Sequence, residues 1–156
     1  MQMFTRENLA KIDALKARYP TTKAMTLPVL WIAQEQFGWI SPETMRYVAE
    51  LLNLPVHHIY GVITFYTMFN TKPVGKHHLQ VCTNVSCQLR GADRISRHLC
   101  NRLGVRVGET TSEKKFTITE VECLGSCGTA PMMRVNDDYH ENLTEDKIDQ
   151  LLTEFR

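Results

Sequence analysis

The chain has 156 residues, of which 43% are hydrophobic and 22% are charged, and its formal net charge is +1. This length suits about one domain of ordinary composition, and the balanced charge excludes any electrostatic argument for binding nucleic acid or an anionic membrane. The sequence has no run of about 18 apolar residues, and its first residues lack the apolar stretch of a signal peptide. We therefore expect a cytoplasmic protein without direct membrane insertion, whose thiols stay reduced.

The beginning of the sequence predicts two helices. Thr5 is a suitable N-cap for a helix over residues 6–19, because its side chain can accept a hydrogen bond from the first turn. A second, apolar helix is predicted within residues 26–40. Pro28 must lie near the start of this helix or kink it, since proline lacks the amide hydrogen that a helix interior needs.

A third helix is predicted over residues 41–53, with Ser41 as its N-cap and Pro42 at the first helical position. Residues 54–69 are ambiguous, because they begin like a helix but include the strand-like letters VITFY. This stretch is rich in large apolar groups. We expect it to be either core of the helical region or a docking surface for a partner.

The polar segment over residues 70–76 contains proline and glycine, and it predicts a boundary between residues 1–72 and residues 73–156. Beyond it the patterns predict a strand, a helix, a strand, a hairpin and a final helix. The expected ranges are 77–83 for the first strand, 87–103 for a helix capped by Ser86 and ended by Gly104, 115–123 for the second strand, 131–143 for the hairpin, and the residues after Thr144 for the last helix. This order predicts a small layered α/β unit with a partly thioredoxin-like pattern.

Four of the five cysteines form two close pairs, Cys82 with Cys87 and Cys123 with Cys127. Cys82 and Cys123 each end a predicted strand. If those strands are neighbours, both following loops leave the same edge of the sheet and the four sulfurs can converge. Four thiolates are suitable ligands for zinc or for a small iron–sulfur cluster.

The spacing within each pair favours the cluster. Zinc knuckles usually have two residues between their cysteines, whereas these loops hold four and three. Gly125 and Gly128 would let backbone amides approach the sulfurs. A 2Fe–2S cluster with two ligands to each iron fits best, and zinc and a pair of disulfides remain as alternatives that the spacing and the reducing compartment disfavour. A redox dithiol is discounted because it normally has the shorter C-x2-C spacing.

A resemblance to a known family is carried by the ordered motifs C-x4-C and C-x3-C, by CLGSCGTAP, and by the upstream GVITFYTMF. Through these motifs the chain resembles the small 2Fe–2S subunit of NADH:quinone oxidoreductase, the E subunit of respiratory complex I. Related subunits occur in NAD-reducing hydrogenases and NAD-dependent formate dehydrogenases. The likeness covers nearly the whole chain, including WISPETMRYVAELLNLP and GETTSEKKFTITEVECLG. It implies an α+β fold, in which an N-terminal helical bundle is followed by a thioredoxin-like domain that often carries a cis proline at the position of Pro131.

The resemblance also implies a function. Its four cluster ligands fall on Cys82, Cys87, Cys123 and Cys127, and no catalytic residue is expected in this chain. The implied partners are a flavoprotein subunit that carries FMN and the NADH site, with which the cluster would exchange single electrons, and other peripheral-arm subunits at the inner membrane. A subunit of a hydrogenase or formate dehydrogenase, and a zinc-stabilised interaction module, are the alternative interpretations. Cys100 lies within a predicted helix, and we interpret it as a packing residue.

Overall fold

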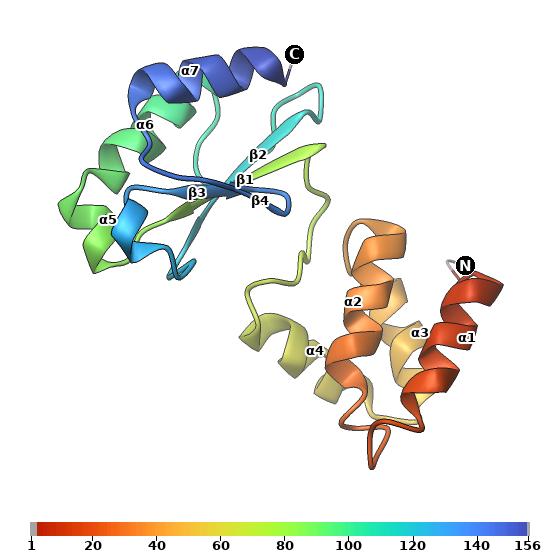
Figure 1. The fold of residues 1–156 in the computed structure, drawn as a ribbon. Coiled ribbons are helices and arrows are strands. Elements are labelled where there is room, and N and C mark those ends of the chain that lie inside the picture. The colour runs from red at the N-terminus through yellow and green to blue at the C-terminus, as the bar shows by residue number, and fades with distance from the viewer. Residues whose placement is uncertain (1–2, 156) are drawn as a thin grey trace. The chain divides into compact units, whose positions relative to one another are not determined.

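The computed structural model describes residues 3–155 and divides into two compact units, one up to Pro73 and one from Val74 onward (Figure 1). Each unit has its own cluster of buried apolar side chains. That these units are separate domains stays a prediction. No helix in the described part of the chain is both long enough and apolar enough to cross a membrane.

The described residues of the first unit form four helices, whose ends follow local signals. Thr5 accepts a hydrogen bond from the Asn8 amide, and Ser41 accepts one from the Thr44 amide, as N-caps do. The first helix ends earlier than predicted, four residues before the tyrosine that precedes Pro20. The helices are α1 (Arg6–Leu15), α2 (Thr26–Phe37), α3 (Pro42–Leu52) and α4 (Val56–Phe65).

The ambiguous segment after Pro55 is helical, because α4 covers most of it and ends at Phe65. Ile59 and Ile63 lie one turn apart and are fully buried in the apolar cluster of this unit. Tyr60 and Phe65, in contrast, have 57% and 76% of their surface exposed. The segment therefore supplies core on one side and an exposed apolar surface on the other. The four helices share one core, and their description as a bundle stays a prediction.

The described part of the second unit holds a four-stranded sheet with the order β2-β1-β3-β4. β1 (His77–Cys82) pairs in parallel with β2 (Phe116–Val121) on one side. On its other side, β1 pairs antiparallel with β3 (Met133–Val135). β4 (Asp138–His140) completes the predicted hairpin at the edge. The register places Cys82 opposite Val121, so β1 and β2 end together.

Alternation along β1 gives the sheet two different faces. Leu79 and Val81 are buried in the main core of this unit. Gln80 and Cys82 point to the opposite face, because successive side chains of a strand alternate. On that face the Arg134 guanidinium donates hydrogen bonds of 2.8 and 2.6 Å to the Gln80 side-chain oxygen. The sequence alternation thus keeps Cys82 out of the main core.

The start of β1 is tightly packed against the neighbouring strand. The Gly75 amide donates a 2.6 Å hydrogen bond to the Thr117 hydroxyl. A Cβ atom on Gly75 would lie only 2.8 Å from the carbonyl carbon of Lys115 and the amide nitrogen of Phe116. Glycine is therefore needed here for close approach of two backbones.

Two helices, α6 (Ala92–Leu103) and α7 (Glu145–Glu154), lie over one face of the sheet (Figure 1). The single helix predicted over residues 87–103 is wrong. The structure has a short α5 (Val85–Leu89), capped by Asn84 rather than Ser86, followed by a break at Gly91, whose φ of 93° is left-handed. The predicted Gly104 C-cap and the Thr144 N-cap are both confirmed.

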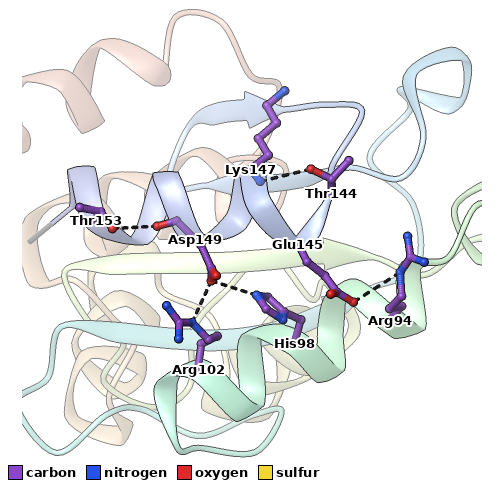
Figure 2. Close-up of polar contacts among 8 residues, drawn as sticks. All are labelled: Arg94, His98, Arg102, Thr144, Glu145, Lys147, Asp149 and Thr153. Carbon is purple, nitrogen blue, oxygen red and sulfur yellow. Dashed lines mark hydrogen bonds and ion pairs between the residues drawn. The ribbon is translucent and has the colours of Figure 1, made fainter.

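A row of polar contacts joins α6 to α7, as Figure 2 shows. Arg94 approaches Glu145 at 3.5 Å, and both His98 and Arg102 bond to the Asp149 carboxylate, at 2.9 and 2.8 Å. The hydrogen bond with His98 and the charge of Arg102 lower the pKa of Asp149. Because these pairs are partly exposed, each contributes little to stability.

Candidate metal centre

The parallel pairing of β1 and β2 brings the two cysteine pairs to one end of the sheet. Cys82 is the last residue of β1, and Cys123 follows the end of β2 by two residues. Cys87 lies inside α5, and Cys127 begins a short 3-10 helix, Cys127–Thr129. Figure 1 shows α5 and that short helix at the same end of the sheet. Cys87 is therefore within a helix rather than at the start of the long helix that was predicted.

The first pair is buried. Cys82 and Cys87 expose only 3% and 1% of their surface, and they pack with Ala92, Ala130 and Met132 in a small apolar cluster beside the main core. The Cys82 amide donates to the Met132 carbonyl oxygen at 3.2 Å, which ties the end of β1 to the segment after the cis bond between Ala130 and Pro131. The backbone around this pair is thus fixed by the fold.

The Cys87 thiol has an unfavourable environment for its charged form. Burial, a hydrogen bond with Cys82, and the electrostatic effects of Cys82 and Cys127 raise the pKa of Cys87 to about 11, against the effect of a backbone hydrogen bond from Met132. In the metal-free chain this thiol is therefore protonated near neutral pH. A bound metal would displace that proton, because the thiolate is the ligand.

The second pair is exposed. Cys123 and Cys127 both reach solvent. Between them Gly125 has a left-handed φ of 77°, and its amide donates to the Cys123 sulfur at 3.3 Å. This is the amide–sulfur contact that the glycine-rich loop predicted, and hydrogen bonds to the sulfurs are one factor that sets the potential of an iron–sulfur centre.

Side chains from β4 and its end hold this loop in place, and the sequence patterns did not reveal them. Tyr139 donates its hydroxyl hydrogen to the Leu124 carbonyl oxygen at 2.7 Å. The Glu141 carboxylate accepts hydrogen bonds from the hydroxyls of Ser126 and Thr129. These two hydroxyls lower the pKa of Glu141, so the carboxylate is charged at neutral pH. No spacing motif marks such contacts, because they depend on where the edge strand lies.

The donor set suits a cluster with two irons. The four candidate sulfurs come as two pairs, one from each loop. Four cysteine thiolates are the ligands of a 2Fe–2S cluster. Cys100 lies apart from them in α6, half-buried against the main core, and burial raises its pKa.

Comparisons with known proteins agree with this arrangement. Residues 12–156 match the family described as thioredoxin-like [2Fe-2S] ferredoxin. A relative from Rickettsia felis, named as the E subunit of NADH-quinone oxidoreductase, is 43% identical over 97% of this chain and 93% of its own length. A Rhizobium meliloti relative, also named as an E subunit of NADH-quinone oxidoreductase, is 45% identical over 94% of this chain and 87% of its own. These relatives confirm the resemblance inferred from the cysteine motifs.

A solved structure shares the fold. An NAD+-reducing [NiFe]-hydrogenase in the air-oxidised state superposes with a TM-score of 0.74 over 84% of this chain, at 20% identity, and the match spans 22% of that longer chain. At this identity the likeness concerns the fold alone. The family match covers nearly all of the sequence, and the near-full-length relatives are named for the same kind of subunit. On this evidence the chain belongs to the thioredoxin-like [2Fe-2S] ferredoxin family.

Proposed function

We propose that this chain is the electron-transfer E subunit of an NADH:quinone oxidoreductase and holds one 2Fe–2S cluster. The observation that carries the proposal is the meeting of the two cysteine pairs at the end of the parallel strands β1 and β2. The names of the near-full-length relatives support the choice of complex. The proposed ligands are Cys82, Cys87, Cys123 and Cys127.

When bound, the cluster would supply one-electron redox chemistry. The chain supplies its surroundings. The buried pair, Cys82 and Cys87, would exclude water on one side, whereas the exposed pair, Cys123 and Cys127, would leave the other side open to a partner. The Gly125 amide would stabilise negative charge on the Cys123 sulfur. This asymmetry suits an electron carrier, which must protect its centre yet present it within reach.

The proposed partner is the flavoprotein subunit that carries FMN and the NADH site, and the cluster would exchange single electrons with that flavin. Val85 and Leu89, on either side of Cys87 in α5, expose 65% and 84% of their surface. Exposed apolar groups beside a redox centre support a docking role for that surface. The subunit would lie in the cytoplasm, peripheral to the inner membrane through the rest of the complex.

Metal and sulfide analysis of the anaerobically purified chain, with EPR after dithionite reduction, tests the proposal. We expect about two irons and two sulfides per chain and a rhombic S = 1/2 signal. Cys123→Ser should lose or alter the cluster, while the matched control Cys100→Ala should keep it. One zinc without sulfide would instead support the zinc-stabilised interaction module, and an unchanged spectrum for Cys123→Ser would overturn the ligand assignment.

A second assembly remains a candidate because of one observation, the shared fold with the NAD+-reducing [NiFe]-hydrogenase. An equivalent subunit of such a hydrogenase, or of an NAD-dependent formate dehydrogenase, would hold the same cluster. Purification of the native assembly and identification of its subunits separates these cases. Quinone-reducing subunits would support the first proposal, and a nickel–iron subunit would support the second.

A further inference from the structure

The edge strand β4 and the residue that follows it contact the second ligand loop at two points. Tyr139 lies within β4, and Glu141 directly follows its last residue, His140. Their partners on the loop, Leu124 and Ser126, are two residues apart. The strand end and the loop therefore run alongside each other, joined by two contacts, with Gly125 between them.

The Glu141 carboxylate closes the far end of the loop. One of its oxygens accepts hydrogen bonds from both Ser126 and Thr129, which flank Cys127 on its two sides. The two hydroxyls also lie 2.7 Å from each other. Glu141 thus holds together residues on both sides of one candidate ligand, and its negative charge lies one hydrogen bond from each of them.

Glu141 is itself held by the main body of the unit. Its carbonyl oxygen accepts a 2.6 Å hydrogen bond from the Lys147 ammonium group of α7. The next residue, Asn142, donates its amide to the Thr129 carbonyl oxygen at 2.7 Å. The exposed loop is in this way connected, through one carboxylate and one strand end, to a helix packed on the core.

We propose that Glu141 and Tyr139 are positioning residues, which fix the conformation of the Cys123–Cys127 loop for the cluster, and that the charge of Glu141 lowers the reduction potential of that cluster. The proposal rests on the proposed function, because it assigns the two side chains to that same centre. Neither residue is expected to touch the cluster. Glu141 acts through Ser126 and Thr129, and Tyr139 acts through the backbone at Leu124.

The positioning role is tested on the full, metal-free chain, so that it does not depend on the cluster. Residue-specific amide hydrogen exchange is measured by NMR at Thr129 and Asn142, whose amides are hydrogen bonded within this region, with Ile148 in α7 as the reference amide. Glu141→Ala should speed exchange at the Thr129 and Asn142 amides by about tenfold relative to the reference, since it removes two hydrogen bonds to a charged acceptor. Glu141→Gln retains an acceptor oxygen and should restore most of the protection.

Matched variants separate this role from general effects. Glu145→Gln removes a carboxylate four residues further on that contacts Arg94 instead of the loop, and it should leave both amides unchanged. Tyr139→Phe removes only the hydroxyl and should speed exchange by about threefold at the Gly125 amide, which shares a peptide unit with the Leu124 carbonyl that Tyr139 contacts. Tyr60→Phe, at an exposed tyrosine of the first unit, is its control. Exchange at Thr129 and Asn142 that is equal in wild type and Glu141→Ala, or too fast to measure in wild type, would overturn the positioning role.

The charge is tested on chains loaded with the cluster under anaerobic conditions. Both Glu141→Gln and Glu141→Ala should shift the midpoint potential to more positive values, because each removes a negative charge that disfavours the reduced state. Only Glu141→Ala should also change the EPR g-values, because only it releases the loop. A potential that is the same in wild type and Glu141→Gln would overturn the electrostatic role. Failure of the wild-type chain to take up a cluster would refute the proposed function, while the exchange result would still decide the positioning role.

Discussion

The small apolar cluster around the buried cysteines predicts a difference between two adjacent methionines. Met132 and Met133 are both fully buried, with 0% and 1% of their surface exposed. Met132 packs with Cys82 and Cys87, whereas Met133 belongs to the main core of the unit. Truncation of either to alanine removes two carbons and the sulfur from a buried site. It should therefore cost a similar free energy of unfolding.

The magnitude follows from the atoms removed. At about 0.8 kcal/mol for each methylene-sized group, the lost transfer free energy is about 2.4 kcal/mol, and the cavity left behind adds about 1 kcal/mol. Each variant should thus lose about 3 kcal/mol, measured by urea unfolding of the metal-free chain and followed by circular dichroism. A loss under about 1 kcal/mol for Met132→Ala would show that this cluster is not packed as described.

The two variants should differ in access to the first cysteine pair. Because both lower global stability equally, exposure of thiols by whole-unit unfolding rises equally in both. Only Met132→Ala opens space beside Cys82 and Cys87, so a thiol reagent should modify these two about tenfold faster in Met132→Ala than in Met133→Ala. Equal rates in the two variants would refute a local role for Met132 and assign thiol access to global unfolding.

Three further outcomes are expected. Gly75→Ala should lower the free energy of unfolding by about 1–3 kcal/mol in urea titrations, because its Cβ would meet the Lys115 backbone at 2.8 Å. Burial holds the pKa of His78 at about 4, below its reference value of 6.5. The contribution of His78 to the free energy of unfolding should therefore be full above pH 6.5 and decline as the pH falls from there towards 4. His78→Gln should reduce that decline by about 1–2 kcal/mol, and an unchanged pH profile would contradict this expectation. The lowered pKa of Asp149 stabilises the fold above the pKa of this carboxyl in the unfolded chain, and that contribution is lost as the pH falls through the pKa in the folded chain. Asp149→Asn should remove this loss of stability at acid pH in thermal melts, with Asp138→Asn as its control.

Local chemistry made much of the fold predictable. The caps Thr5, Ser41 and Thr144 act through hydrogen bonds to amides a few residues away, so their signals are contained in short stretches of sequence. The strand–helix–strand order after Val74 was readable from hydrophobic periodicity. The sequence analysis could only assume that β1 and β2 are neighbours, because the pairing of strands distant in sequence depends on the whole fold.

The errors also have physical reasons. Residues 87–103 keep one apolar stripe, and the periodicity carries on across Gly91, which hid the left-handed break that ends α5. In residues 54–69 the strand-like composition suggested a strand, while the one-turn spacing of Ile59 and Ile63 suggested a helix. The segment is helical because a helix buries both isoleucines in the core of the first unit.

The candidate site was predictable to the extent that it lies in motifs. Cysteine spacing singled out the four thiols, and the glycine after Cys123 and Leu124 indicated an amide near a sulfur. The burial of one pair and the exposure of the other were not predictable, since they depend on which sheet face Cys82 occupies and on how Met132 packs. Contacts from Tyr139 to the loop depend likewise on the tertiary fold.

The small apolar cluster around Cys82 and Cys87 is separate from the main core of the second unit. This separation bears on whether the chain needs its metal in order to fold. In the described part of the second unit, the main core contains none of the four candidate ligands. The pairing of β1 with β2 already brings the two loops together. The entropic cost of closing the chain between the two cysteine pairs is therefore met by folding, before any metal binds. We therefore expect the second unit to fold without metal, unlike small zinc domains that unfold without their ion. If the chain holds the proposed 2Fe–2S cluster, we expect a cluster lost to oxidation to be rebuilt on the same folded chain.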